Sequence, residues 1–144
     1  MAPELAATDA ASYKFWITER IRFADLDVLG HVNNIAFTVY AESCRAAFLR
    51  HIGFWTPQPG ERQAVLAHIE LDYRRELHYP GDVRVGLVVL HIGGSSVRVG
   101  LGLFDGGHCA ATAQAVLVRI ERGSRRPTAL NAEERASLAP YLRG

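Results

Sequence analysis

The segment NIAFTVYAESCRAAFLRHI, residues 34–52, decides the fold, because it contains no glycine or proline and Gly53 follows it directly. It predicts a helix of about five turns, roughly 28 Å long, with Gly53 as the C′ residue that ends it. Its apolar side chains lie on most sides: Ile35, Phe37, Val39, Tyr40, Cys44, Ala47, Phe48 and Ile52. A helix that is apolar nearly all round is expected to be buried.

Alternating apolar residues predict strands on both sides of this helix. Before it, in residues 13–23, one face carries Phe15, Ile17, Ile21 and Phe23. After it, the same period of two recurs in residues 65–73, 83–90 and 97–103, and residues 108–121 are expected to form the last and longest strand. Turn residues separate these later segments at 79–82, 93–94 and 105–107. Connections this short predict antiparallel strands.

The order of one strand, one helix and four strands indicates an α+β fold. A helix that is apolar on all sides requires a sheet that curls around it, so we expect a five-stranded antiparallel sheet wrapped around one long buried helix. This arrangement resembles the hot-dog fold. Asn131 and Glu134 form the pattern of a capping box and predict a short C-terminal helix. We expect residues 1–12 to be unstructured and residues 13–144 to form a single domain.

Composition excludes several classes of protein. The 144 residues are 49% hydrophobic, and 16 Lys and Arg against 15 Asp and Glu give a net charge of +1. This balance gives no electrostatic reason to expect a nucleic acid or a membrane surface as partner. The longest apolar stretches are about six residues, against the roughly twenty of a spanning helix. Residues 1–12 lack the basic start of a secretory signal, and Cys44 and Cys109 have no metal or redox spacing. We expect a cytoplasmic protein with reduced thiols.

The densest polar segment, ADLDVLGHVNN at residues 24–34, joins the first strand to the long helix. Together with Tyr40, Glu42 and Arg45 in the helix, it resembles the signature of the 4-hydroxybenzoyl-CoA thioesterase family of hot-dog proteins. Residues 13–55 match most closely, and a looser likeness continues to residue 141. The resemblance implies an acyl-CoA thioesterase, which hydrolyses an acyl or aroyl thioester to a carboxylic acid and free coenzyme A.

Elementary chemistry of the segment agrees with this implication. The start of a helix exposes unpaired N–H groups and the positive end of its dipole. The backbone N–H of Asn34 can therefore hold a carbonyl oxygen that becomes negative during acyl transfer. Asp27 can activate water or attack the carbonyl carbon, and Gly30 lets the backbone approach a ligand closely. The loop thus has the donor and the carboxylate that thioester hydrolysis needs.

Structural roles remain open for the neighbouring residues. Asp25 and Asp27 can both serve as turn residues, but in the family the second aspartate carries the chemistry, so we expect Asp27 to be catalytic and Asp25 to support it. His31 is either a general acid or a residue that orders the loop. Asn33 is expected to cap the helix and thereby shape the oxyanion site.

Glu42 lies about 12 Å along the helix axis from Asn34. It is therefore expected to support the site from a distance or to form an i,i+3 ion pair with Arg45. Cys44 sits in the middle of the apolar helix without an activating group, so it is not expected to be a nucleophile. On the strand at residues 65–73, a metal site at His68, Glu70 and Asp72 is less expected than a polar sheet face or a subunit contact.

The substrate is expected to lie along the helix. Phe37, Val39 or Tyr40 would line the acyl chain, and Arg74 and Arg75 would meet the phosphates of coenzyme A, unless they are simply solvated. Coenzyme A arrives as part of the substrate, acyl carrier protein is an alternative carrier, and no metal or redox cofactor is expected. The acyl chain cannot be read from the sequence.

Two other functions compete with the thioesterase. A hot-dog 3-hydroxyacyl thioester dehydratase would use a histidine and an acid, such as His31 and Glu42, but His31 lacks the proline-rich surroundings of those enzymes. A non-catalytic acyl-thioester-binding module would have no need for Asp27. The exposed edges of a single curled sheet predict a homo-oligomer, and the resemblance implies a dimer or tetramer with sites at the subunit boundary.

Overall fold

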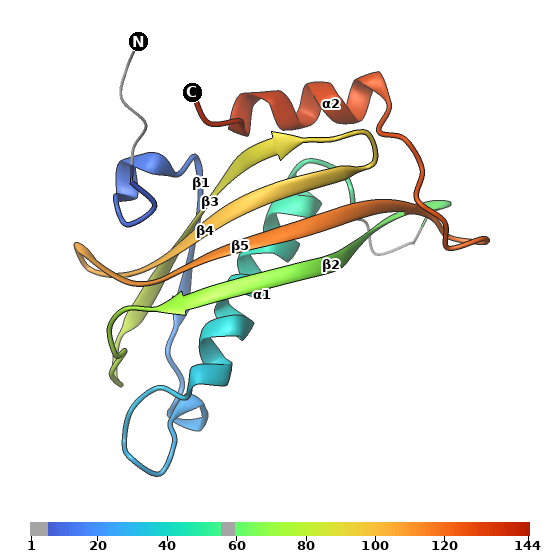
Figure 1. Cartoon of the computed structure of the whole chain (residues 1–144). Helices are drawn as coiled ribbons and strands as arrows, with labels where there is room; N and C mark the ends of the chain where they lie inside the picture. Colours follow the sequence, from blue (N-terminus) through green and yellow to red (C-terminus); the bar gives the residue numbers. More distant parts are fainter. Residues whose placement is uncertain (1–5, 56–59) are drawn as a thin grey trace.

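The computed structural model describes residues 6–55 and 60–144. Within them, five antiparallel strands form one sheet in the order β1-β3-β4-β5-β2. The strands are β1 (Phe15–Arg20), β2 (Arg62–Tyr73), β3 (Asp82–Ile92), β4 (Ser96–Asp105) and β5 (His108–Glu121). Helix α1 (Asn34–His51) crosses one face of the sheet, and α2 (Ala132–Leu138) is the short C-terminal helix (Figure 1). The α+β hot-dog architecture predicted from the sequence is confirmed.

Helix α1 begins and ends where the sequence predicts. The side chain of Asn33 caps it by accepting a hydrogen bond of 2.9 Å from the Ile35 N–H. At the other end Gly53 has a φ of +82°, the left-handed conformation that glycine adopts without strain.

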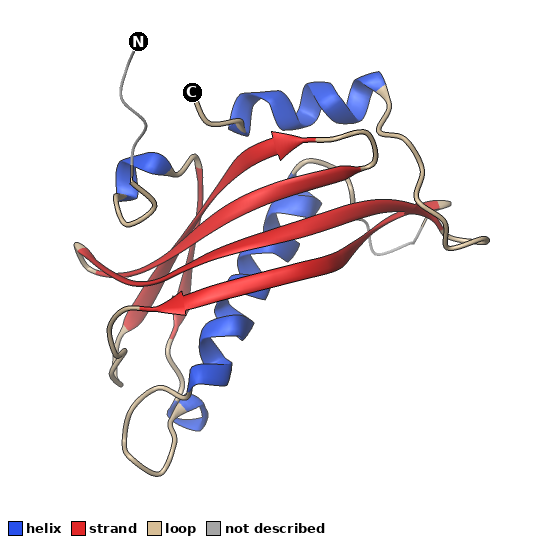
Figure 2. Cartoon of the chain, in the orientation of Figure 1, coloured by secondary structure: helices blue, strands red, loops and turns tan. Residues whose placement is uncertain are grey.

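The sheet covers only one side of α1, so the prediction that this helix is buried all round is wrong within a single chain. The covered stripe has the spacing of one helix face and comprises Ala36, Phe37, Tyr40, Ala41, Cys44, Arg45 and Phe48. On the other side Ile35 is 70% exposed and Val39 is 41% exposed. The helix lies against the sheet as a layer, as Figure 2 shows. Ile35 and Val39 form a short apolar stripe on the side of α1 that the sheet does not cover.

Two cores hold the sheet, one on each face. The larger core lies under α1, where side chains such as Val85, Leu87, Val99 and Leu101 are fully buried. The smaller core lies on the opposite face and comprises Tyr13, Val88 and Phe104. There, Gly86 and Gly102 form a cross-strand pair, and a Cβ atom at either would lie 2.7 Å from the Tyr13 side chain. The two glycines therefore allow the Tyr13 ring to lie directly on the sheet.

The first strand is shorter than predicted, because the chain turns away from the sheet after Arg20. Residues Phe23–Asp25 form a short 3-10 helix, and Phe23, expected on the core face, is 75% exposed. Upstream, Ala10–Ser12 also form a 3-10 helix capped by Asp9, where an unstructured terminus was expected; residues 1–5 of that terminus lie outside the described part. No helix in the described part is long and apolar enough to cross a membrane.

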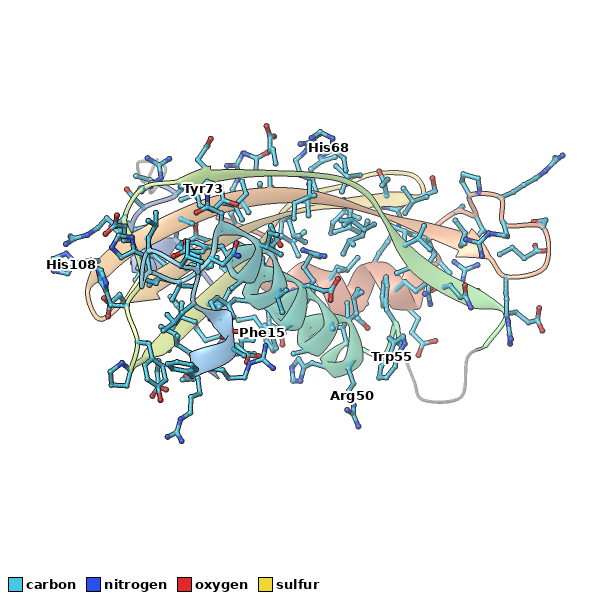
Figure 3. The ribbon with its side chains drawn as sticks, turned by 90° about the horizontal axis from the view of Figure 1, so that it is seen from below. Phe15, Arg50, Trp55, His68, Tyr73 and His108 are labelled. Carbon is cyan, nitrogen blue, oxygen red and sulfur yellow. The ribbon has the colours of Figure 1, made fainter. Side chains whose placement is uncertain are left out.

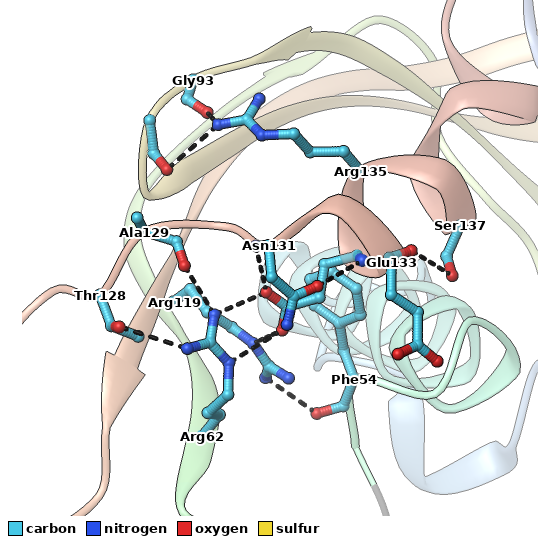
Figure 4. A network of polar contacts seen from close by, with 12 residues as sticks. Phe54, Arg62, Gly93, Arg119, Thr128, Ala129, Asn131, Glu133, Arg135 and Ser137 are labelled. Carbon is cyan, nitrogen blue, oxygen red and sulfur yellow. Dashed lines mark hydrogen bonds and ion pairs between the residues drawn. The ribbon is translucent and has the colours of Figure 1, made fainter.

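A buried ionic network ties α2 to the sheet. Glu134 accepts hydrogen bonds from Arg62 Nη2 and Arg119 Nε, both at 2.6 Å, and from the backbone of Asn131 at 3.0 Å (Figure 4). Arg119 also donates to the carbonyl of Phe54 just beyond α1. The reciprocal bonds between Asn131 and Glu134 confirm the predicted capping box. Burial alone would raise the pKa of Glu134, but the hydrogen bonds from the two arginines and Asn131 lower it to about 2.

Replacing this carboxylate should weaken the fold in a pH-dependent way. A pKa lowered from 4.5 to about 2 corresponds to about 3 kcal/mol of folding free energy at pH 7. Because the folded-state pKa is depressed, this stability is fully present above about pH 5 and is lost as the pH falls toward 2. We expect Glu134→Gln to be less stable than the wild type by up to about that amount at pH 7 in urea unfolding.

The matched control is Glu133→Gln, since Glu133 is exposed on the same helix turn. It should change the unfolding free energy by less than about 0.5 kcal/mol. A deficit for Glu134→Gln that stays constant between pH 7 and pH 3 would show that the network does not act through the ionised carboxylate.

Candidate active site

The polar segment forms a tight loop that closes on itself before α1. Leu26 and Val32 pair as an isolated antiparallel bridge. Inside this bridge the N–H of Asp27 donates to the carbonyl of His31 at 2.9 Å, and the N–H of Gly30 donates to the carbonyl of Asp27 at 3.1 Å. Gly30 has a φ of +84°, which explains why glycine is needed at this turn. The loop therefore places Asp27 and His31 opposite each other.

The carboxylate of Asp27 is held by one of its two oxygens. Oδ1 accepts hydrogen bonds from the N–H groups of Leu29, at 2.9 Å, and His31, at 3.3 Å. Both bonds assigned to this carboxylate in the described part of the chain use Oδ1, which leaves Oδ2 for water or a ligand. The half-buried side chain is thus oriented by the backbone of its own loop while one oxygen stays available.

Asp25 is buried, and both oxygens of its carboxylate accept hydrogen bonds from the protein. Its Oδ2 accepts hydrogen bonds from the Tyr40 hydroxyl at 2.6 Å and the Arg22 N–H at 2.9 Å, and its Oδ1 accepts one from Arg22 Nη2 at 3.0 Å. Burial would raise the pKa of Asp25, but the hydrogen bonds from Tyr40 and Arg22 hold it below its ordinary value. Burial and the bond to Asp25 both raise the pKa of Tyr40.

This bond changes the role expected for Tyr40. The sequence placed Tyr40 along the acyl chain, whereas in the structure it is only 2% exposed and its hydroxyl is committed to Asp25. The carbonyl of Asp25 in turn accepts the N–H of Asn33, the cap of α1, at 2.8 Å. Tyr40 therefore positions the loop and the start of the helix.

The start of α1 is shaped by a residue that the sequence did not single out. The hydroxyl of Tyr73, at the end of β2, donates to the carbonyl of Asn34 at 3.0 Å. Its ring meets that of Phe37 edge-on, with centroids 5.2 Å apart. The N–H of Asn34 has no acceptor within the helix because it belongs to the first turn. No sequence signal showed that Tyr73 reaches the start of the helix.

Other predicted site residues lie further away. Glu42 is exposed, and no close ion pair joins it to Arg45 among the described residues, although burial lowers the pKa of Arg45 and the charge of Glu42 acts against this effect. Arg45 is buried instead, and its Nη1 has no hydrogen-bond partner among the described residues. Arg74 Nε donates to Thr112 Oγ1 at 3.1 Å, in a groove on the sheet face away from α1. Arg75 is exposed.

The helix cysteine and the polar residues of β2 lie in surroundings that do not bring reactive groups together. Burial raises the pKa of the Cys44 thiol to about 12, which leaves almost no thiolate at neutral pH. His68, Glu70 and Asp72 are exposed on β2, with His68 on the side away from α1 (Figure 3). They do not converge on a common point; among the described residues the potential metal ligands that do converge are His31, Glu76 and His78.

Comparison with known proteins identifies the family. The model of the thioesterase-like superfamily matches residues 21–138. The chain belongs to this superfamily. The solved PA5185 protein of Pseudomonas aeruginosa strain PAO1 is similar, with 30% identity, a TM-score of 0.86 and coverage of 93% of this chain and 95% of that one. The family resemblance read from residues 23–45 is thereby confirmed.

Two further relatives extend the comparison. A thioesterase of Thermus thermophilus, solved with coenzyme A and Zn, is 32% identical, with a TM-score of 0.77 and coverage of 90% and 95% of the two chains. The YsmA protein of Bacillus subtilis strain 168, whose function is uncharacterised, is 24% identical and spans 88% of this chain and 86% of its own length. Together these comparisons support thioesterase chemistry and leave the acyl group open.

The bond between Tyr40 and Asp25 yields a prediction. Tyr40→Phe removes one donor from a buried carboxylate, which should cost about 1–3 kcal/mol of unfolding free energy. Chemical unfolding followed by circular dichroism measures it. Tyr79→Phe is the control, since Tyr79 is 45% exposed and should tolerate the change. Equal stabilities of Tyr40→Phe and wild type would refute the positioning role.

Proposed function

We propose that the protein hydrolyses an acyl-CoA thioester, with Asp27 as the catalytic carboxylate. The observation that carries this proposal is the arrangement of the Asp27 carboxylate, in which Oδ1 is fixed by two backbone N–H groups and Oδ2 stays available. A carboxylate held in this way at the entrance to a helix N-terminus suits attack on a carbonyl group.

In the proposed reaction the thioester oxygen lies at the start of α1. The N–H of Asn34 and the positive end of the helix dipole stabilise the negative charge that forms on this oxygen. Oδ2 of Asp27 either takes a proton from the attacking water or attacks the carbonyl carbon itself, giving an anhydride that water then cleaves. In both routes the C–S bond breaks, the thiolate of coenzyme A leaves, and water supplies the oxygen of the carboxylic acid.

The remaining residues orient these groups. His31 acts in this proposal through its backbone, since its N–H and carbonyl both hold Asp27. Asn33 sets the start of the helix, and Asp25 and Tyr40 anchor the loop. The acyl chain would lie on the exposed apolar stripe of α1, and an exposed arginine such as Arg75 would meet the phosphates of coenzyme A. The reaction requires no metal or redox cofactor.

The thiol carrier is proposed to be coenzyme A. The thioesterase of Thermus thermophilus was solved with coenzyme A. Because its sequence is similar to this one over most of both chains, coenzyme A is the first candidate ligand for this chain. The dehydratase alternative is less favoured, because Glu42, the acid expected to act with His31, is exposed and lies about 12 Å along the helix from Asn34.

We also propose that two chains complete the site. Strand β2 is an edge of the sheet, and Leu66 and Tyr73 on it are 43% and 49% exposed. Since Tyr73 also bonds Asn34, a second chain paired with this edge would lie beside the start of α1. It would cover the exposed Ile35 and Val39 and close the acyl site. A long unpaired edge favours such pairing.

The central prediction concerns Asp27→Asn, which preserves the size of the side chain and removes its charge. Hydrolysis should fall by about 100-fold or more, the lower range for loss of a general base. A thiol-release assay with a panel of acyl-CoAs measures the rate. Asp105→Asn, at the end of β4, is the control and should keep the wild-type rate. A variant that keeps more than half the wild-type rate, or a wild type that releases no thiol from any acyl-CoA, would contradict the proposal.

The assembly has its own test. Light scattering at micromolar concentration should give at least twice the chain mass of 15.9 kDa. Leu66→Arg places a charge on the β2 edge, so it should shift the protein toward the monomer and lower activity with it. A fully active wild-type monomer would rule out the shared site.

A further inference from the structure

A second cluster of reactive side chains lies beside the proposed site. His31 Nδ1 lies 3.4 Å from Glu76 Oε1, and His78 Nε2 lies 3.7 Å from Glu76 Oε2. One ligand atom from each of the three residues lies within 4.8 Å of the others. The rings of His31 and His78 stand nearly perpendicular, with centroids 5.3 Å apart. None of the proposed hydrolytic steps uses these imidazole and carboxylate groups.

The backbone builds this cluster from two segments that are distant in sequence. The N–H of Val32 donates to the carbonyl of Leu77 at 3.0 Å, which joins the loop to the segment before β3. Val32 and Leu77 are 3% and 0% exposed, so both side chains point into the core. Their neighbours are therefore directed outward, His31 on one segment and Glu76 and His78 on the other. The convergence follows from core packing and does not require the ion pairs, because such pairs contribute little at a surface.

We propose that His31, Glu76 and His78 bind a divalent cation of the zinc class. Two imidazole nitrogens and one carboxylate oxygen form a donor set that zinc uses where one coordination position stays open. Tetrahedral zinc with bonds of about 2.0–2.1 Å places its ligand atoms about 3.4 Å apart. The distance from His31 Nδ1 to Glu76 Oε1 has this value, 3.4 Å, while His78 Nε2 lies 3.7 Å from the other oxygen, Oε2. Imidazole also favours zinc over magnesium or calcium. The remaining separation closes by rotation of exposed side chains.

A bound ion would clamp the catalytic loop. His31 holds Asp27 through its N–H and its carbonyl, so fixing the His31 ring to Glu76 and His78 fixes that part of the loop to the segment before β3. The ion would act on loop order and on the fold, not on the thioester. The site is therefore separate from the proposed hydrolysis and can be tested without a substrate.

The test is isothermal titration calorimetry. Zinc chloride is titrated into the tag-free protein after a chelator has removed bound metal. We expect one zinc ion per chain. Loss of a ligand should weaken binding at least about tenfold, since even residues that only orient a ligand contribute 10–100-fold. His78→Ala and the isosteric Glu76→Gln should both show this loss. Zinc should also raise the melting temperature of the wild type but not of His78→Ala.

His108→Ala is the matched control, because His108 is an exposed histidine beside Cys109, where zinc could bind adventitiously. Its affinity for zinc should equal that of the wild type. Undiminished binding by His78→Ala and Glu76→Gln, or loss of binding in His108→Ala alone, would overturn the proposed site. This measurement does not involve thiol release. A failure of the zinc proposal would therefore not contradict the proposed thioesterase activity.

Discussion

The buried carboxylate of Asp25 is the interaction on which the candidate site depends. It accepts hydrogen bonds from Arg22, where the chain leaves β1, and from Tyr40, in the buried face of α1. Its backbone carbonyl accepts the N–H of Asn33, the helix cap. One residue thus joins a strand end, a loop and a helix start. Asp27, two residues later, takes its orientation from a loop whose ends are held in this way, so that the Asp27 carboxylate and the start of α1 are tied to the same anchor.

The fold was predictable from the sequence because its signals are local. Alternation of apolar residues marks the strands, and Asn33 and Gly53 mark the ends of α1 through capping and a left-handed turn. The residues whose burial the sequence predicts wrongly depend on tertiary contacts. Phe23 follows the alternation but is exposed, because hydrogen bonds between Arg22 and Asp25 turn the chain into a 3-10 helix. The sequence predicts that Ile35 is buried, but it is exposed because a single sheet covers only one face of the helix.

The candidate site was predictable only in part, for the same reason. The cap at Asn33 follows from neighbours within a few residues, and the structure contains it. The bond from Tyr40 to Asp25 spans fifteen positions, and the bond from Tyr73 to Asn34 spans thirty-nine. The cluster of His31 with Glu76 and His78 likewise joins two segments through the Val32–Leu77 hydrogen bond. Spacing along a chain cannot reveal such pairs, because sheet register and core packing bring them together.

The most direct test of the account is a crystal structure of the protein with an acyl-CoA analogue whose sulfur is replaced by a methylene group, which keeps the carbonyl and blocks hydrolysis. We predict the carbonyl oxygen within about 3 Å of the Asn34 N–H, with its carbon facing Asp27 directly or through one water. A carbonyl group more than about 8 Å from both the Asn34 N–H and the Asp27 carboxylate would contradict the account, because that span exceeds a hydrogen bond plus one bridging water.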